Sequence, residues 1–172
     1  MAIFRRLTAL LAGLSGLAGC NDANKITFVN QTNLYSPQMV RASGFRAEIY
    51  GAPRAGATLA QTLEGLHAPG WASATPLTPA SEPGRHGRLV LIFNPAGSAP
   101  SAAMCTNPDD FEGKAQDAPL RVFAAYCMAD RLVARGALSA PGIPKANSPG
   151  YAEAMNNLFA AMLPPHQPPG NK

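Results

Sequence analysis

The sequence lacks a cluster of basic residues. It holds 14 Lys and Arg against 10 Asp and Glu, and Arg5 and Arg6 stand near its start. The other arginines are scattered along the chain: Arg41, Arg46, Arg54, Arg85, Arg88, Arg121, Arg131 and Arg135. Because a nucleic-acid interface gathers basic side chains on one face, we expect no nucleic-acid partner.

Metal-ligand spacing is also missing. The histidines, His67, His86 and His166, are far apart in the sequence, and none stands at a zinc-ligand spacing from another. The acidic group Asp109, Asp110 and Glu112 offers carboxylate oxygens but lacks the twelve-residue calcium-loop pattern. We therefore read the histidines and the acidic group as surface residues and predict neither a metal nor another cofactor.

No complete catalytic motif occurs. Ser98 and Ser101 follow an apolar stretch, where hydrolases often carry a nucleophile, but Gly97-Ser98-Ala99-Pro100 is not the G-x-S-x-G elbow. No aspartate and histidine follow in an order that completes a triad. The chain is therefore predicted not to be an enzyme, with a small envelope hydrolase at Ser98 or the acidic group as the alternative.

The N-terminal apolar run is too short to be a permanent membrane span. It extends over residues 7–17 after Arg5 and Arg6, whereas a spanning helix needs roughly 20 residues. A basic start, an apolar middle and small residues before a cleavage point are typical of an export signal. The sequence therefore predicts a signal peptide over residues 1–19.

The end of this signal, Leu17-Ala18-Gly19-Cys20, resembles the bacterial lipobox. The resemblance implies that Cys20 receives a diacylglyceryl group, that the chain is cut before it, and that the new N-terminus is acylated. Two or three acyl chains anchor a protein stably, so the implied partner is a membrane. Asn21 follows the cysteine, which implies the outer membrane facing the periplasm. An uncleaved helix with an incidental cysteine is the alternative.

Two cysteines remain beyond Cys20. Cys105 and Cys127 form an even pair in a compartment that oxidises thiols, which favours a disulfide. A disulfide that closes a loop of this length reduces the entropy of the unfolded chain and thereby stabilises the fold by about 3 kcal/mol. Their spacing is too wide for a C-x-x-C redox pair. Reactive or metal-binding thiols are the alternative.

Four segments are predicted along the chain: the signal, a lipidated N-terminus and tether over 20–43, a folded domain over 44–163 and a disordered tail over 164–172. The tether is rich in polar residues and has one short strand-like stretch at 26–29. Residues 45–50 alternate as a half-buried strand does. Leu59, Leu63 and Leu66 share one helical face within 58–66.

The second half of the chain predicts further strands and one long helix. Residues 72–87 read as a loop with a short extended piece near Leu77, and 89–93 as a strand buried on both faces at the sheet centre. An irregular stretch over 96–119 contains Cys105. Residues 120–138 read as a hairpin with Cys127 near its tip, with a helix over 128–135 as the alternative.

For the last helix, Ser148 is the predicted cap, and the apolar face consists of Tyr151, Met155, Leu158, Phe159 and Met162. These elements predict an α+β domain: a small mixed β-sheet with two or three helices packed on one face and one disulfide.

The C-terminal third adds a second resemblance. Leu132-Val133-Ala134-Arg135-Gly136, followed by a Pro/Gly loop and a helix ending in Met162-Leu163-Pro164-Pro165, resembles proteobacterial envelope lipoproteins without an established activity. Their small α+β domains are similar to the N-terminal domain of the Tol-system periplasmic protein. The resemblance implies a non-enzymatic accessory or binding module with an envelope protein partner. A chiefly structural lipoprotein is a further alternative.

A binding surface is the remaining candidate site. Trp71, Tyr50 and Tyr126, with Phe93, are large aromatic residues of the kind that line grooves in small domains. Filling of the core is the alternative use of the same side chains.

Overall fold

The computed structural model describes residues 24–51, 57–73, 75–80, 87–113, 119–141, 146–148 and 150–167. Within them, one sheet has the strand order β1-β6-β5-β4-β2-β3. The strands are β1 (Lys25–Gln31), β2 (Arg46–Tyr50), β3 (Thr78–Pro79), β4 (Gly87–Phe93), β5 (Leu120–Met128) and β6 (Arg131–Ala140). β2 pairs in parallel with β3 and β4, and the other neighbours are antiparallel. The predicted small mixed sheet is confirmed.

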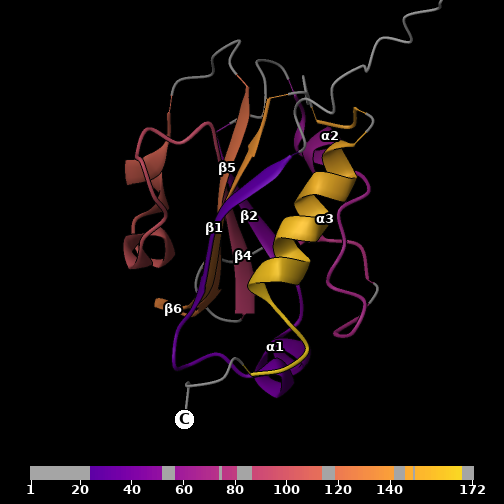
Figure 1. Cartoon of the computed structure of the whole chain (residues 1–172), viewed down its shortest axis with the longest axis vertical. Coiled ribbons are helices and arrows are strands. Elements are labelled where there is room, and N and C mark those ends of the chain that lie inside the picture. The colour runs from indigo at the N-terminus through magenta and orange to yellow at the C-terminus, as the bar shows by residue number, and fades with distance from the viewer. Residues whose placement is uncertain are drawn as a thin grey trace, which may run out of the picture.

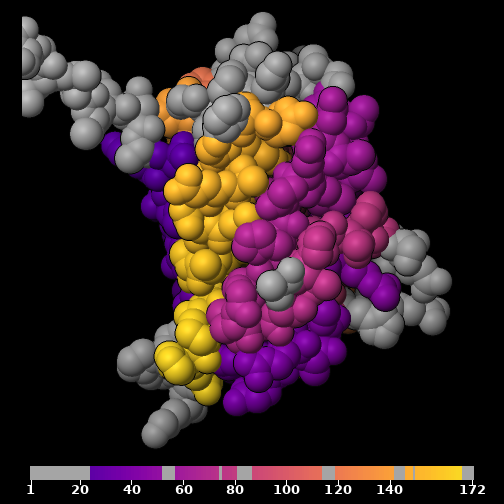
Figure 2. Space-filling view, turned by 90° about the vertical axis from the view of Figure 1, so that its right-hand side faces the viewer, coloured from indigo at the N-terminus to yellow at the C-terminus, as the bar shows by residue number. Residues whose placement is uncertain are grey.

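Helices cover one face of the sheet. They are α1 (Pro37–Ser43), α2 (Leu59–Leu63) and α3 (Tyr151–Met162), and all three lie on the same side in Figure 1. Figure 2 shows α3 beside residues 57–80, with α1 at one end of both. The opposite face carries the short 3-10 helices η1 (Ala102–Cys105) and η2 (Pro108–Phe111). The α+β class with helices on one face is therefore confirmed.

Two apolar clusters lie on the two sides of the sheet, and β4 contributes to both. Leu89, Leu91 and Phe93 join the larger cluster under the helices, whereas Val90 and Ile92 join the smaller one under η1. Every residue of β4 is buried, because both faces of this central strand are covered. The prediction of a strand buried on both faces is confirmed.

The predicted hairpin is β5 and β6, joined by a turn at Ala129 and Asp130. This pairing excludes the alternative helix over 128–135. Cys127, next to the last residue of β5, is bonded to Cys105 of η1, with a Cα–Cα distance of 5.7 Å. The disulfide is confirmed, and it ties the irregular stretch that carries η1 to the sheet.

The apolar face predicted for the last helix is buried in α3. Gly136 of β6 permits this close packing, since a Cβ there would lie 2.7 Å from Met162 Cγ. The predicted Ser148 cap is wrong: the residue before the helix is Gly150, at φ 82°, a left-handed conformation that favours glycine. Ser148 instead accepts the Tyr151 N–H through its backbone carbonyl at 3.0 Å.

α2 and β3 are short elements at their predicted positions, but α2 ends at Leu63, before the end of the helix predicted over 58–66. Thr58 and Gln61 form a reciprocal capping box that begins α2. β3 lies directly after Leu77, where the sequence indicates a short extended piece. None of the described helices is both long and apolar enough to cross a bilayer.

The described part of the predicted tether belongs to the fold, so this prediction is wrong for residues 25–43. β1 pairs along its length with β6, and α1 buries Val40 in the larger cluster. The strand-like stretch predicted at 26–29 lies within β1, but its pairing with a distant strand makes it part of the sheet rather than of a tether. The ordered sheet begins at Lys25.

The chain ends predicted from the sequence are only partly described. The signal over 1–19 and Cys20 lie outside the described residues, as do residues 168–172 of the predicted tail. At the start of that tail, the Pro164 carbonyl accepts a hydrogen bond from the Tyr35 hydroxyl. Residue 164 is therefore attached to the fold.

Candidate binding surfaces

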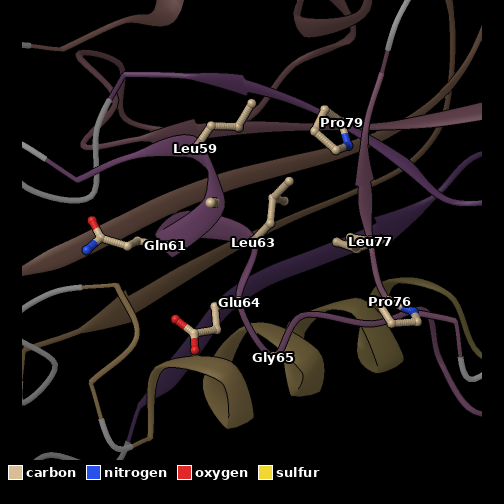
Figure 3. A pocket seen from close by; sticks show the side chains of 9 residues that line it. Leu59, Gln61, Leu63, Glu64, Gly65, Pro76, Leu77 and Pro79 are labelled. Carbon is tan, nitrogen blue, oxygen red and sulfur yellow. The ribbon is translucent and has the colours of Figure 1, made fainter.

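An apolar groove with a volume of about 780 Å³ lies between α2 and residues 76–79 (Figure 3). Its lining consists of Leu59, Ala60, Gln61, Leu63, Glu64, Gly65, Pro76, Leu77 and Pro79. Leu59, Leu63, Leu77 and Pro79 turn toward one another, whereas the polar ends of Gln61 and Glu64 point away from them. Leu59 is 47% exposed, which is unusual for a leucine beside a core. The groove therefore offers apolar contacts to a ligand.

The edge of the sheet beside this groove cannot accept another strand. Pro79 has no backbone N–H, and the Leu77 and Ala80 N–H groups already donate to Leu66 and Ala47. Among the described lining residues there is no serine, cysteine or histidine. The groove can therefore bind apolar side chains, and Glu64 is the one ionisable residue among the described residues that line it.

A second hollow of about 440 Å³ lies on the opposite face of the sheet, between β1 and residues 98–100. β5 and β6 form its floor through Phe123 and Ala137, and Phe28 of β1 forms one wall. Ser98 stands on the other wall. We call this hollow the β1 recess.

Two arginines fix the walls of the β1 recess. Arg121 donates to the Gly97 carbonyl at 3.2 Å, with its guanidinium carbon 6.0 Å from the Phe123 ring centroid. Arg135 donates to the Pro100 carbonyl at 2.9 Å and lies 5.3 Å from the Phe28 ring centroid. Arginine over an aromatic face is a favourable electrostatic contact. These pairs hold the loop and the edge strand against the sheet.

A third, charged hollow of about 290 Å³ surrounds a buried ion pair. Glu48 Oε1 lies 2.9 Å from Arg88 Nε, close enough for an ion pair but not aligned as a hydrogen bond. Arg88 also donates to the Cys105 carbonyl at 2.8 Å and to the Ala129 carbonyl. Asp109 and Asp130 stand at the rim. Arg88 thus joins β2, η1 and the hairpin turn, a structural role.

The aromatic residues predicted as one binding surface are not brought together. Tyr126 is fully buried in the larger cluster, where its hydroxyl donates to the Gly44 carbonyl at 3.1 Å. Tyr50 packs against the smaller cluster on the other face of the sheet. Trp71 is half-buried and donates its Nε1–H to the Leu163 carbonyl at 2.8 Å. The surface prediction is wrong because side chains alternate between the two faces of a sheet: Tyr50 pairs with Ile92 on one face and Tyr126 with Leu89 on the other. Phe93 belongs to the core as well.

Burial raises the pKa values of the tyrosine hydroxyls. Removal from water raises the pKa of Tyr126 to about 12 and also raises the pKa values of Tyr35 and Tyr151. Burial, followed by the charge of Glu48, raises the pKa of Tyr50. These hydroxyls remain protonated and serve as hydrogen-bond donors rather than as acid–base groups at neutral pH.

The serines serve different purposes. Ser98 is exposed on the wall of the β1 recess, and the described lining residues include no histidine or carboxylate. Ser101 caps η1 by accepting the Ala103 N–H. The structure therefore does not assemble a triad around either serine in its described part.

The acidic and histidine candidates are also separated. Asp109 and Asp110 are exposed on η2, and Glu112 accepts the Gly51 N–H at 3.0 Å. His67 and His166 are exposed, and His86 lies outside the described residues. Within the described residues, no group of three or more His, Cys, Asp or Glu is placed to hold a metal ion.

The groove and the β1 recess are only partly indicated by the sequence. Leu59 and Leu63 are on the predicted helical face, but the groove exists because residues 76–79 return beside α2. The β1 recess depends on the pairing of β1 with β6, and the expected tether had concealed this pairing.

The comparisons with known proteins add no family to this description. No family model, curated protein or solved structure matches the chain.

Proposed function

We propose that this protein is a lipoprotein of the bacterial cell envelope. A lipid on Cys20 anchors it in the outer membrane, and its folded domain faces the periplasm. Its folded domain acts as a binding module rather than as an enzyme. The similarity of residues 17–20 to a lipobox supports the anchor. The mostly apolar lining of the groove supports binding as its activity.

The observation that carries the proposal is the distance between the anchor and the fold. β1 begins at Lys25, five residues after Cys20. Five residues span at most roughly 17 Å when fully extended. A lipid on Cys20 would therefore hold the sheet at the bilayer surface, not at the end of a long tether.

The disulfide is consistent with this location. Cys105 and Cys127 are both buried, and they are bonded in a domain small enough to gain substantially from a cross-link. Structural disulfides persist in oxidising compartments such as the periplasm.

The partner proposed for the groove is an apolar segment of another envelope protein. Leu59 and Leu63 provide one wall, and Leu77 provides the other. Since Pro79 prevents the addition of a strand at this edge, recognition would come from side chains that enter the groove. A helix with an apolar face fits these requirements.

The anchor is tested by the intact mass of protein extracted from the membrane, measured with an alkylating agent before and after reduction. We expect loss of residues 1–19, an added lipid mass on Cys20, and alkylation of Cys105 and Cys127 only after reduction. A Cys20→Ser variant is the control and should carry no lipid. An unmodified Cys20 in the wild type would contradict the proposal.

The groove is tested by photo-crosslinking in the cells that process the chain. A benzophenone amino acid at position 59 is expected to form a discrete adduct with one envelope protein, because Leu59 lies at the open groove. The same probe at Ala103, which is exposed on η1 on the other face, is the control. Absence of an adduct at position 59, or the same adduct at both positions, argues against a partner in the groove.

A further inference from the structure

The end of the sheet nearest the proposed anchor carries a row of paired residues. Lys25 of β1 pairs with Ser139 of β6, which in turn pairs with Arg121 of β5. Neighbouring strands are about 4.8 Å apart, so the Arg121 backbone is roughly 10 Å from that of Lys25. The β1 recess opens beside this row, since Ser139 and Arg121 both line it.

The chemistry of the β1 recess fits an anion that carries an apolar group. Among the described residues that line it, Arg121 is the only charged one. Arg121 is exposed, and the hydrogen bond of its guanidinium to the Gly97 carbonyl uses one donor of five. Phe123 and Ala137 supply an apolar floor. A phosphate at Arg121 would find charge complementarity and further donors.

Apolar side chains are exposed beside the recess. Phe28, which lines the recess, is 36% exposed, and Ile26, two residues earlier in β1, is 38% exposed. Lys25 is exposed next to them. Exposed apolar and basic side chains together are typical of surfaces that bind the interface of an anionic membrane.

We propose that the β1 recess binds the phosphate of an anionic phospholipid headgroup in the leaflet that holds the anchor, with Arg121 as its cationic ligand and Phe28 at the interface. This inference rests on the proposed function, because the short segment between Cys20 and Lys25 is what brings the recess to that leaflet. Headgroup binding fixes how the domain stands on the membrane, with the anchored end of β1 against the lipid.

The test uses the lipidated protein in nanodiscs of phosphatidylcholine alone or of an equimolar mixture with phosphatidylglycerol, with amide hydrogen exchange as the readout. Exchange over residues 25–31 and 97–100 is expected to be slower with phosphatidylglycerol by about fivefold, the contribution of one arginine near an anionic surface. Arg121→Gln removes the difference, and Arg121→Lys retains most of it. Arg46→Gln, an exposed arginine at the opposite end of the sheet, leaves the difference unchanged.

Two outcomes would overturn the inference. Equal exchange in both kinds of nanodisc, from protein whose mass shows lipid on Cys20, would refute headgroup binding and leave the anchor standing. The same protection produced by inorganic phosphate with phosphatidylcholine alone would make the recess a site for a soluble anion. Absence of lipid on Cys20 would instead overturn the proposed function itself.

Discussion

Replacement of Arg88 by methionine is expected to lower the free energy of unfolding by about 3–5 kcal/mol, the cost of leaving a buried charge without its partner. Glu48 is 9% exposed and Arg88 is 5% exposed, so solvation by water compensates poorly for the lost ion pair. The carbonyl groups of Cys105 and Ala129 lose a donor at the same time. The measurement is urea unfolding followed by far-ultraviolet circular dichroism.

Arg46 provides a matched control for this variant. It pairs with Arg88 across β2 and β4, but its side chain is exposed, and Arg46→Met should change stability by less than about 0.5 kcal/mol. The double variant Glu48→Leu with Arg88→Met should recover much of the loss, because removal of both charges avoids an unpaired carboxylate. Equal unfolding curves for Arg88→Met and Arg46→Met would show that the buried pair does not stabilise the fold.

Loss of the Cys105–Cys127 disulfide is expected to cost about 3 kcal/mol. The cysteines are 22 residues apart, and the bond limits the freedom of the loop between them in the unfolded chain. In the folded state it holds η1 over the smaller apolar cluster. The double variant Cys105→Ala with Cys127→Ala should therefore unfold at lower urea concentration than the oxidised wild type.

Reduction of the wild type supplies the comparison for the disulfide. The reduced wild type and the double alanine variant should unfold alike, and both should show faster amide exchange over η1 and η2 than over β4. Unfolding curves that do not change on reduction would mean that packing alone holds η1 in place.

The sequence predicted best those elements whose signal is local. The continuous apolar run of β4 and the apolar face of α3 each indicate burial without knowledge of the rest of the fold. The disulfide followed from an even pair of cysteines in an exported chain, and the hairpin from two β-prone runs around a short turn. Each of these signals lies within one segment or one pair of residues.

Elements stabilised by distant partners were harder to predict. β1 is exposed along most of its length and depends on β6 more than 100 residues away. The strand-like stretch at 26–29 indicates the strand, but the polar residues around it suggest a tether rather than an edge of the sheet. Gly150 takes the place of Ser148 before α3 because the local backbone is left-handed there. The separation of Tyr50 from Tyr126 depends on the register in which β2 and β5 pair with β4, and the spacing of aromatic residues in the sequence does not reveal that register.

The candidate site was less predictable than the fold. Arg121 is one of several scattered arginines in the sequence, and only the order β1-β6-β5 places it beside Phe28 and Ser139. The groove forms only where residues 76–79 lie against α2. Taken alone, the sequence of neither segment indicates a groove. Both hollows are products of tertiary structure.

The unequal edges of the sheet limit how copies of this domain can self-associate. β1 offers seven residues at one edge of the sheet, whereas β3 at the other edge has two residues and includes Pro79. If two copies paired through β1, each would use its one long edge strand, and the result would be a closed dimer with two-fold symmetry. Within the described residues, the β3 edge offers no strand that could continue the array, so edge-to-edge pairing stops at a dimer and does not extend into a filament.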